Sequence, residues 1–491
     1  MCNQISKTGI MRTPFFLLLF VALLVISPLC GASESDFKIH NKQSPYIRAV
    51  LFDIYQEKYS SAIGHLISQR YRHKQGKARY QGELLLAHTY ITFRMHDEAE
   101  KILNALPKSM PTDEIRNKNV LWMDIAKARF RAGDIKAAQN TLYKLDKNIS
   151  NKLSREREVF QAQILMSQNK FKQAIEVLEN TRGSSEWAAY GRYNLGVMLV
   201  RLGQDERGIK KLGTVANMDP DTVEMKALKD KANYTLGYIY LRNKNPDKAK
   251  DYLRSIRLDS PLSNKALMHL GLVYAELDKH KQSLAVWLEL SKRNPSDPTV
   301  LESKLAVPFA YAELGGFEQA VRNYSTAIEI YRSESKHIDS VIRSVKKGHT
   351  TKTILANMSK NGPGSFSESS LLPVTKDTQY LMGLYKSNEF QEVISNFRDL
   401  RALQEKLKKW ASAIHKIENM SKTFKKVYVD KIAKQQSRLA TATKQLKQQI
   451  TKMAITELKD RKSRLNTYIK QAQFATAQIY DKGRSNSSGG G

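Results

Sequence analysis

Few residues in this sequence have the types and spacing that catalysis or metal binding requires. The ten histidines are scattered, and the nearest to a pair, His88 and His96, has no acidic cluster beside it. Because a metal site needs several converging His, Cys, Asp or Glu ligands, we interpret these histidines as structural or solvated. Residues 346–351 superficially resemble a phosphate-binding loop, but they lack the upstream glycine and the Gly-Lys-Ser/Thr core. The sequence therefore predicts no catalytic residue, no metal, no cofactor and no enzymatic activity.

The remaining residues that could bind a ligand are the basic ones. Lys and Arg number 80 and Asp and Glu 48, which gives a formal net charge of +32. A charge of this size attracts anions over a long range. Nucleic acid, anionic lipid headgroups, anionic polysaccharide and acidic protein surfaces are all candidate partners. The cellular compartment of the protein determines which of these partners it can meet.

Residues 1–32 have the pattern of a secretory signal peptide. Two basic residues precede the apolar run 15–26, and small residues follow it. The run is short for a membrane span and typical of a signal peptide. We predict cleavage after Ala32. The alternatives are an uncleaved anchor and lipidation of Cys30, although Leu29 is not the small residue that a lipidation motif places before its cysteine.

The cysteine content supports export by a bacterium. Both cysteines, Cys2 and Cys30, lie in the predicted signal, so the mature chain can form no disulfide. Secreted eukaryotic proteins of this size usually carry disulfides. We therefore predict a periplasmic protein, for which nucleic acid is not an expected partner. Anionic polysaccharide, lipid headgroups and acidic proteins stay open.

The elements that position the basic residues show a repeat of about 34 residues. Leu-Gly pairs occur at 195–196, 236–237 and 270–271, and a proline follows each leucine by 25 residues. The second and third pairs are followed by tyrosines, Tyr240 and Tyr274. A small residue lies between each pair and its proline, and small residues continue the series in both directions, at positions 62, 99, 138, 174, 208, 249, 283 and 320.

This pattern resembles the tetratricopeptide repeat (TPR), in which Leu-Gly-x-x-Tyr, small, aromatic and proline positions recur over 34 residues. The resemblance implies two antiparallel helices per repeat, A and B, with the small residue allowing B to approach A closely. Because one repeat cannot bury its own apolar face, neighbours must stack. We therefore expect an all-α fold, with a right-handed TPR superhelix of about eight repeats over residues 45–332.

The resemblance also implies where a partner would bind. In TPR arrays helix A lines the concave face, which often holds an extended peptide. Aromatic and arginine side chains suit binding hot spots, and cations favour an acidic segment or a terminal carboxylate. The repeat register places these predicted contact residues on that face: Lys127, Arg131, Tyr193, Arg201, Tyr234, Tyr238 and Arg242.

Beyond the eighth repeat the pattern fades. We expect a partly helical linker with a loop over 333–376, a further helical hairpin over 377–397 and a flexible tail over 483–491. Residues 398–482 contain neither Gly nor Pro, which favours one long helix. Its apolar register weakens over 428–437, which indicates a kink or a fold-back there.

The start of this long helix has the heptad pattern of a coiled-coil seam. Pairing within the chain and pairing in a homodimer are both open. This end of the chain is also strongly basic, with 21 Lys and Arg and 6 Asp and Glu over residues 401–490, which favours an anionic partner. The seam residues are Leu400, Leu403, Leu407, Trp410, Ile414, Ile417 and Phe424.

Together these features predict a non-enzymatic scaffold or adaptor of the bacterial cell envelope. The TPR concave face would hold one envelope protein, and the C-terminal helix would hold a second partner or form a dimer. The alternative is a scaffold in the secretion or handling of an anionic exopolysaccharide. Salt distinguishes the two, because binding through charge alone weakens with ionic strength whereas a peptide in an aromatic groove persists.

Overall fold

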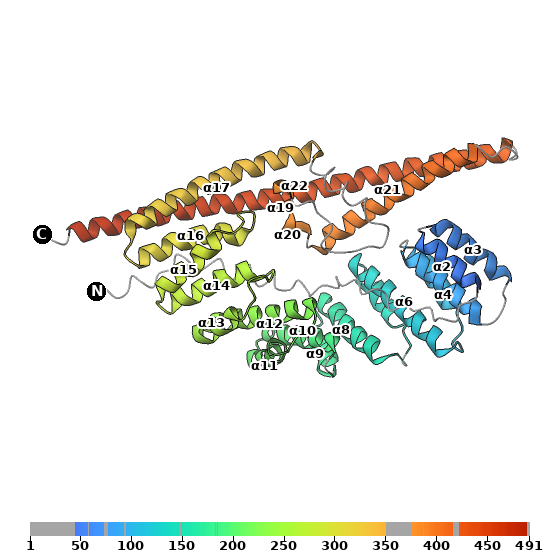
Figure 1. Cartoon of the computed structure of the whole chain (residues 1–491), viewed down its shortest axis with the longest axis horizontal. Coiled ribbons are helices and arrows are strands. Elements are labelled where there is room, and N and C mark those ends of the chain that lie inside the picture. Colours follow the sequence, from blue (N-terminus) through green and yellow to red (C-terminus); the bar gives the residue numbers. More distant parts are fainter. Residues whose placement is uncertain are drawn as a thin grey trace. The chain divides into compact units, whose positions relative to one another are not determined.

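The computed structural model describes residues 45–488, apart from 57, 73–76, 93–94, 147–148, 182, 184, 350–374, 386 and 416–421. The described residues form helices and no strand, so the all-α prediction is confirmed (Figure 1). The predicted signal peptide lies outside them. The chain divides into two compact units, residues 1–211 and 212–491.

Unit 1 is a series of helix–turn–helix repeats in which each second helix packs against the helix before it. The last helix of the series crosses the boundary between the units. The helices of this series are α2 (Pro45–Tyr55), α3 (Tyr59–Arg72), α4 (Lys77–Thr92), α5 (His96–Ala105), α6 (Thr112–Arg131), α7 (Ile135–Leu142), α8 (Asn151–Ser167), α9 (Phe171–Glu179), α10 (Glu186–Arg201) and α11 (Asp205–Ala216), and the second half of α11 belongs to unit 2.

Unit 2 continues with three more repeats and ends in long helices. The repeats are α12 (Val223–Arg242) with α13 (Pro246–Arg254), α14 (Ser263–Glu276) with α15 (His280–Ser291), and α16 (Pro298–Glu313) with α17 (Phe317–Lys346). After them come α19 (Lys376–Gln379), α20 (Met382–Tyr385), α21 (Asn388–His415) and α22 (Lys422–Ser488).

The small residues of the sequence pattern occupy one equivalent position in all eight described repeats. Each is the fourth residue of its helix B, from Ala62 in α3 to Ala320 in α17, and each is buried. A larger side chain there would hold the two helices apart, because protein interiors are closely packed. The structure therefore confirms the repeat register.

The glycine of the Leu-Gly pair allows the same close approach from helix A. A Cβ on Gly237 would lie 2.6 Å from Leu253 Cγ, and a Cβ on Gly271 would overlap the indole of Trp287. That indole is fully buried, and its Nε1–H donates a hydrogen bond to the Met268 carbonyl oxygen at 3.1 Å. Trp287 therefore has no room to move for an added methyl group.

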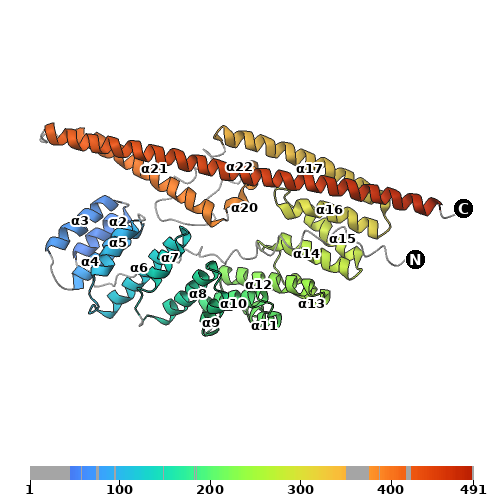
Figure 2. The same cartoon turned by 180° about the vertical axis from the view of Figure 1, so that it is seen from behind.

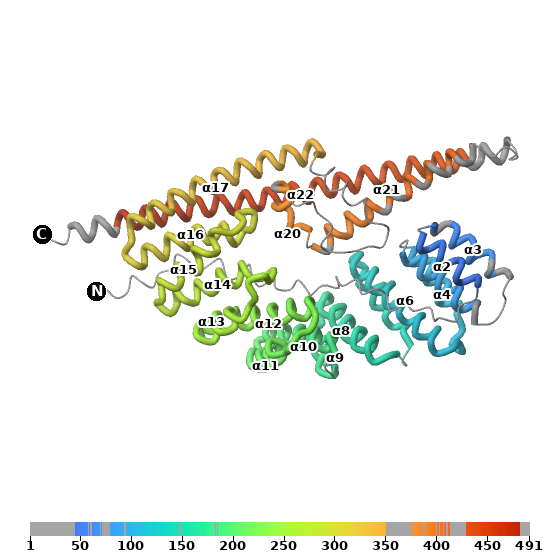
Figure 3. Tube along the Cα trace, in the orientation of Figure 1, coloured from blue at the N-terminus to red at the C-terminus, as the bar shows by residue number. Residues whose placement is uncertain are grey.

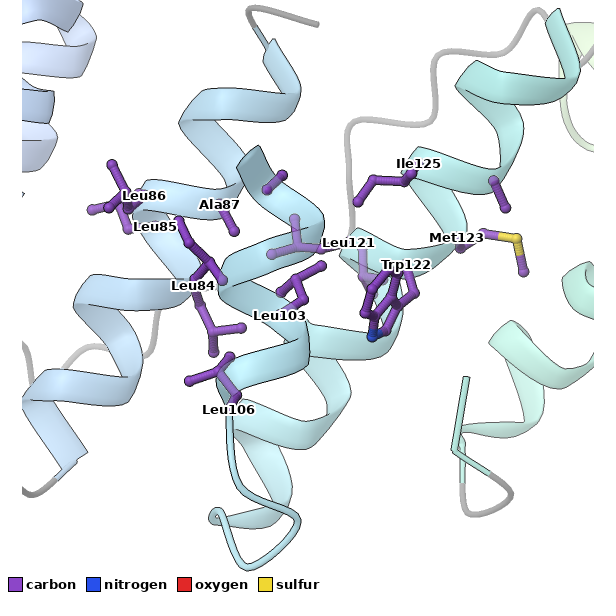
Figure 4. Close-up of a cluster of buried hydrophobic side chains, with 14 of the residues drawn as sticks. Leu84, Leu85, Leu86, Ala87, Leu103, Leu106, Leu121, Trp122, Met123 and Ile125 are labelled. Carbon is purple, nitrogen blue, oxygen red and sulfur yellow. The ribbon is translucent and has the colours of Figure 1, made fainter. Parts of the chain in front are cut away.

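Apolar side chains from successive helices interdigitate to form the core of unit 1. Figure 4 shows Leu84 from α4, Leu103 from α5, and Leu121 and Trp122 from α6 converging on one cluster. All four are at most 2% exposed. Core residues contributed by neighbouring repeats explain why the repeats of unit 1 stack rather than fold singly.

The structure beyond the predicted repeat range differs from the expected boundaries. Helix α17 continues to Lys346, so the first part of the expected linker 333–376 is helical. The range 377–397, expected as a helical hairpin, contains two one-turn helices and the start of α21. Helix α21 already begins at Asn388 and runs to His415.

The chain folds back between α21 and α22, and α22 is one continuous helix through 428–437. The two helices are antiparallel neighbours, joined by a hydrogen bond from Gln404 Nε2 to Thr443 Oγ1 at 3.1 Å. The fold-back therefore occurs before the polar stretch where we expected it. That stretch faces solvent along one side of a regular helix, and this is why the apolar register weakens there.

Helix α22 packs against α17 as well, again antiparallel. Lys462 Nζ lies 2.7 Å from Asp339 Oδ1, and the rings of Tyr331 and Tyr468 are 5.5 Å apart. Figures 1 and 2 show α17 and α21 lying along successive stretches of α22, and Figure 3 traces the same three helices as tubes. The last helix of the chain thus covers the last repeat.

A buried arginine ties α22 to the loop before that repeat. Arg461 is 8% exposed; its Nη1 donates to the Ser296 carbonyl oxygen at 2.8 Å, and its Nε donates to Glu457 Oε1 at 3.1 Å. Burial lowers the pKa of Arg461, while the neighbouring Glu457 opposes that shift. Because buried charges need partners, these bonds fix α22 in one position.

The seam residues fall in different environments. Leu407 is buried, Leu400 is half-buried, and Leu403 is 42% exposed. The side chains of Trp410, Ile414, Ile417 and Phe424 lie outside the described residues. Leu407 is buried within the single chain, and its helix α21 packs against α22. A homodimer through this end of the chain stays a prediction.

Candidate interaction surface

The three tyrosines predicted to contact a partner are part of the core of the repeats. Tyr193 in α10 is 2% exposed, Tyr234 in α12 is 2% exposed, and Tyr238 in α12 is 3% exposed. Large apolar rings of this kind stabilise the helix packing by burial. The structure gives them a packing role, and their contact with a partner stays a prediction.

The predicted cations fall into two groups. Lys127 in α6 forms an ion pair with Glu156 of α8, the first helix of the next repeat, so it joins adjacent repeats. Arg201 at the end of α10 is exposed, and its guanidinium lies over the Phe171 ring at 5.3 Å. The same exposed position at the end of helix A carries Arg131 and Arg242 in other repeats, so this position presents a cation to solvent three times.

In unit 2 the buried tyrosines surround a histidine that was not predicted from the sequence. His269 of α14 packs edge-on against Tyr234 and Tyr238, with ring centroids 5.5 and 6.1 Å apart. Its Nδ1 lies 2.9 Å from the Lys265 carbonyl oxygen and 3.3 Å from the Tyr234 hydroxyl. Burial lowers the pKa of His269, which keeps the ring neutral near neutral pH.

A half-buried carboxyl in α16 belongs to the same interior. Burial raises the pKa of Glu302 to about 8, and the nearby Asp297 adds to the effect. Glu302 in turn contributes to the raised pKa values of Tyr234, Tyr331 and Tyr468, which places it electrostatically beside all three. The first helices of the repeats in unit 2 therefore carry a desolvated carboxyl near the tyrosines.

A buried amide in unit 1 has an unused hydrogen-bond donor. Asn194 of α10 is 4% exposed, and its Nδ2 has no hydrogen-bond partner within the described residues. Buried polar atoms are normally paired, so Asn194 Nδ2 and the equally buried Asn233 Nδ2 of α12 are exceptions among the described residues. Asn194 directly precedes the Leu-Gly pair of its repeat, and His269 holds the same position in its own. The repeat alignment could have identified His269, whereas nothing in the pattern marks Glu302.

The residues considered for chemistry do not come together. Within the described residues no group of His, Cys, Asp and Glu could hold a metal ion. Burial lowers the pKa of His88 to about 4, as expected for a neutral histidine in a helix core. Of the loop-like segment 346–351, residues 350 and 351 lie outside the described part of the chain.

Residues 234–298, which span most of the repeats α12/α13 and α14/α15, match the tetratricopeptide repeat family. This chain contains tetratricopeptide repeats. The matched range carries the two Leu-Gly-x-x-Tyr segments with their buried Ala249 and Ser283. Repeats of this family are typically non-catalytic and serve protein–protein interaction.

Several solved structures are similar to this TPR chain, whereas no curated protein matches it. MamA from the strain AMB-1 is 20% identical, with 36% of this chain and 90% of that chain covered and a TM-score of 0.29. The apo form of RapI is 12% identical, with 78% and 98% covered and a TM-score of 0.39. The apo form of the quorum sensor NprR from B. thuringiensis is 13% identical, with 51% and 97% covered and a TM-score of 0.20.

Proposed function

We propose that this TPR protein is a non-enzymatic adaptor of the bacterial cell envelope that holds a partner protein on the first helices of its repeats. The observation that carries the proposal is the repeat register, in which a small residue is buried at one position of every described helix B. In that register three A helices end in an exposed arginine: Arg131, Arg201 and Arg242. The buried tyrosines form the rigid support behind them.

The chemistry of the surface favours an acidic partner segment. Arginine binds carboxylates with two parallel hydrogen bonds, which gives geometric specificity as well as energy. An extended acidic segment or a C-terminal carboxylate would pair with these guanidinium groups.

The cellular location is also part of the proposal. The pattern of residues 1–32 supports export to the periplasm with cleavage after Ala32, and an uncleaved anchor or a lipidated Cys30 would keep the protein at the membrane. Among the described helices, none has the length and apolar character needed to cross a bilayer. Mass spectrometry of the mature N-terminus from the native cell distinguishes these three outcomes.

The second half of the proposed adaptor is the C-terminal helical region. Helices α21 and α22 would hold a second envelope protein or form a homodimer, beside their packing within the chain. Light scattering of the purified protein over a range of concentrations decides between monomer and dimer. The alternative function, handling of an anionic exopolysaccharide, depends on a basic surface of α22 rather than on the repeats.

The experiment that tests the adaptor is capture from crosslinked cell envelopes with washes at low and high salt. We expect one or a few envelope proteins to survive the high-salt wash and to be lost from a variant with Arg131→Glu and Arg201→Glu, both in unit 1. The matched control carries Lys172→Glu and Lys281→Glu, exposed on the second helices of other repeats, and keeps the partner. Equal retention by both variants would contradict a binding site at the ends of the A helices.

A further inference from the structure

Helix α22 carries a row of cations with no acidic residue among them. From Lys431 to Thr456 the sequence contains neither Asp nor Glu. Five exposed cations in this stretch form no ion pair with any described residue, and we call them the basic strip: Lys434, Arg438, Lys444, Lys447 and Lys452. At about 1.5 Å per residue, the strip is roughly 27 Å long.

The packing of α22 turns most of the strip away from the protein. Ile450 and Ala454 are at most 1% exposed and define the packed side of the helix. With about 100° between successive residues, Lys434, Arg438 and Lys452 lie on the opposite side. Because α21 and α17 hold α22 by its apolar side, Lys434, Arg438 and Lys452 form a line on the solvent side, whereas Lys447 lies on the side that faces α17.

A second element, the end of α17, places more cations at the edge of the basic strip, beside Lys447. The antiparallel packing sets the end of α17 beside the middle of the strip, where a Cβ on Gly348 would lie 3.8 Å from Lys447 Nζ. Arg343, Lys346 and Lys347 at this end are exposed, and they too form no ion pair with a described residue. Two segments about 100 residues apart in the sequence thus converge with charge of one sign. A surface of this kind attracts anions well beyond contact distance.

The residue types in the basic strip indicate which class of anionic partner it suits. No Phe, Trp or Tyr occurs between Tyr428 and Tyr468, so the strip offers no ring on which the bases of a single-stranded nucleic acid could stack. Insertion of a helix into the bilayer interface requires an apolar face, but Ile450 and Ala454 of this stretch are packed inside the protein, so only charge would draw the strip to a membrane. A protein interface usually has an apolar centre and few lysines, which is the opposite of this surface.

What the strip does offer, besides charge, is hydrogen bonding. Gln435, Gln445, Gln448, Gln449 and Thr441 are exposed among the cations. Amide and hydroxyl groups donate and accept hydrogen bonds, which matches a ligand rich in hydroxyl groups. We infer that the basic strip with the end of α17 binds a linear acidic polysaccharide along α22, at a site separate from the repeat surface.

The test uses the full-length protein and polygalacturonate, a linear polymer of carboxylated sugars, with its dissociation constant measured by calorimetry at low salt. The strip variant carries Lys434→Gln, Arg438→Gln, Lys444→Gln and Lys452→Gln, changes that keep the helix because glutamine is a good helix former. The control variant loses the same charge from exposed lysines on the second helices of other repeats, through Lys101→Gln, Lys136→Gln, Lys172→Gln and Lys281→Gln.

We expect the strip variant to bind polygalacturonate more weakly by roughly tenfold or more, with loss of most of the salt dependence. The control should stay within about twofold of the wild type, since distant exposed charges are screened. Equal weakening of both variants would overturn the inference, because net charge alone would then explain binding. Stronger strip-dependent binding to poly-glutamate, or to phosphatidylglycerol vesicles, at the same concentration of negative charge would also overturn it. Circular dichroism and the melting temperature verify that each variant is folded.

Discussion

At the scale of single residues, the repeats depend on positions where any added atom collides. Gly271 is the sharpest case, because the indole that blocks it is both fully buried and hydrogen-bonded. By contrast, a Cβ on Gly213 in α11 of the same unit would meet nothing within 4 Å. The two glycines are therefore a matched pair for separating close packing from helix propensity.

We expect Gly271→Ala to destabilise unit 2 by about 1–3 kcal/mol, the usual cost of overpacking. Gly213→Ala should instead stabilise by about 0.5–1 kcal/mol, because alanine loses less conformational freedom than glycine in a helix. Urea unfolding followed by circular dichroism measures both. A neutral Gly271→Ala variant would show that Trp287 can move aside.

The carboxyl of Glu302 makes a prediction about pH. Because its folded pKa is raised from 4.5 to about 8, the group contributes stability fully below pH 4.5 and loses it as pH rises through 8. Glu302→Gln keeps a neutral side chain of the same shape. We therefore expect the variant to match the wild type near pH 5 and to melt at a higher temperature near pH 9.

The readout is the difference in melting temperature between the two proteins at each pH, not the wild-type profile alone. Lys231 changes the stability with pH in the opposite direction. Burial lowers the pKa of Lys231 to about 8, so its contribution to the stability is lost as the pH falls through that value. That contribution cancels in the difference. A difference that does not change between pH 5 and 9 would mean that Glu302 is well solvated.

At the scale of elements, the turns inside the repeats show how much of the fold the sequence contains. Six consecutive repeats place one residue with positive φ two positions before helix B; three use glycine, and the others use Asn169, Lys244 and Asp278. Glycine and asparagine are familiar signals for this conformation, whereas lysine is not. Stacking with neighbours imposes the turn even where the local residue does not favour it.

The same comparison explains which predictions from sequence succeeded. Small residues that recur every 34 to 41 residues predicted the register, because close helix packing requires them. The periodicity could not separate the exposed edge of helix A from its packed side. Tyr193 and Arg201 were therefore both predicted to contact a partner, although Tyr193 is buried and Arg201 is exposed. The fold-back before α22 had no signal, since residues 386–422 contain neither Gly nor Pro.

The hold of α22 on the last repeat leads to a third prediction. Arg461→Met keeps the side-chain length but leaves the Ser296 carbonyl and Glu457 without their donor, a loss of about 1–3 kcal/mol for buried groups. We expect faster amide exchange in α22 and α17, with α12–α15 unchanged. The control is Lys459→Met, an exposed position on the same helix. Equal exchange in both variants would mean that apolar packing alone holds α22.

At the scale of the whole molecule, a repeat protein should respond to damage locally, because each repeat contacts mainly its neighbours. Ala249 is fully buried at the small position of α13. We expect Ala249→Arg to remove amide protection from α12, α13 and α14, and to leave α4–α9 of unit 1 protected. Hydrogen exchange with mass spectrometry resolves the two regions. Unchanged helicity and melting temperature would show that the repeat register is misplaced.

The packing of α22 on α17 also affects the order in which the chain can fold during synthesis. A ribosome makes the repeats in order, and each can settle on its predecessor as soon as it emerges. The eighth repeat cannot complete its packing in this way, because Tyr331 also packs against Tyr468, in a helix that is made more than 100 residues later. Until synthesis ends, the last repeat exposes an apolar surface. A nascent chain stalled before α22 is therefore the species for which a chaperone would have the most use.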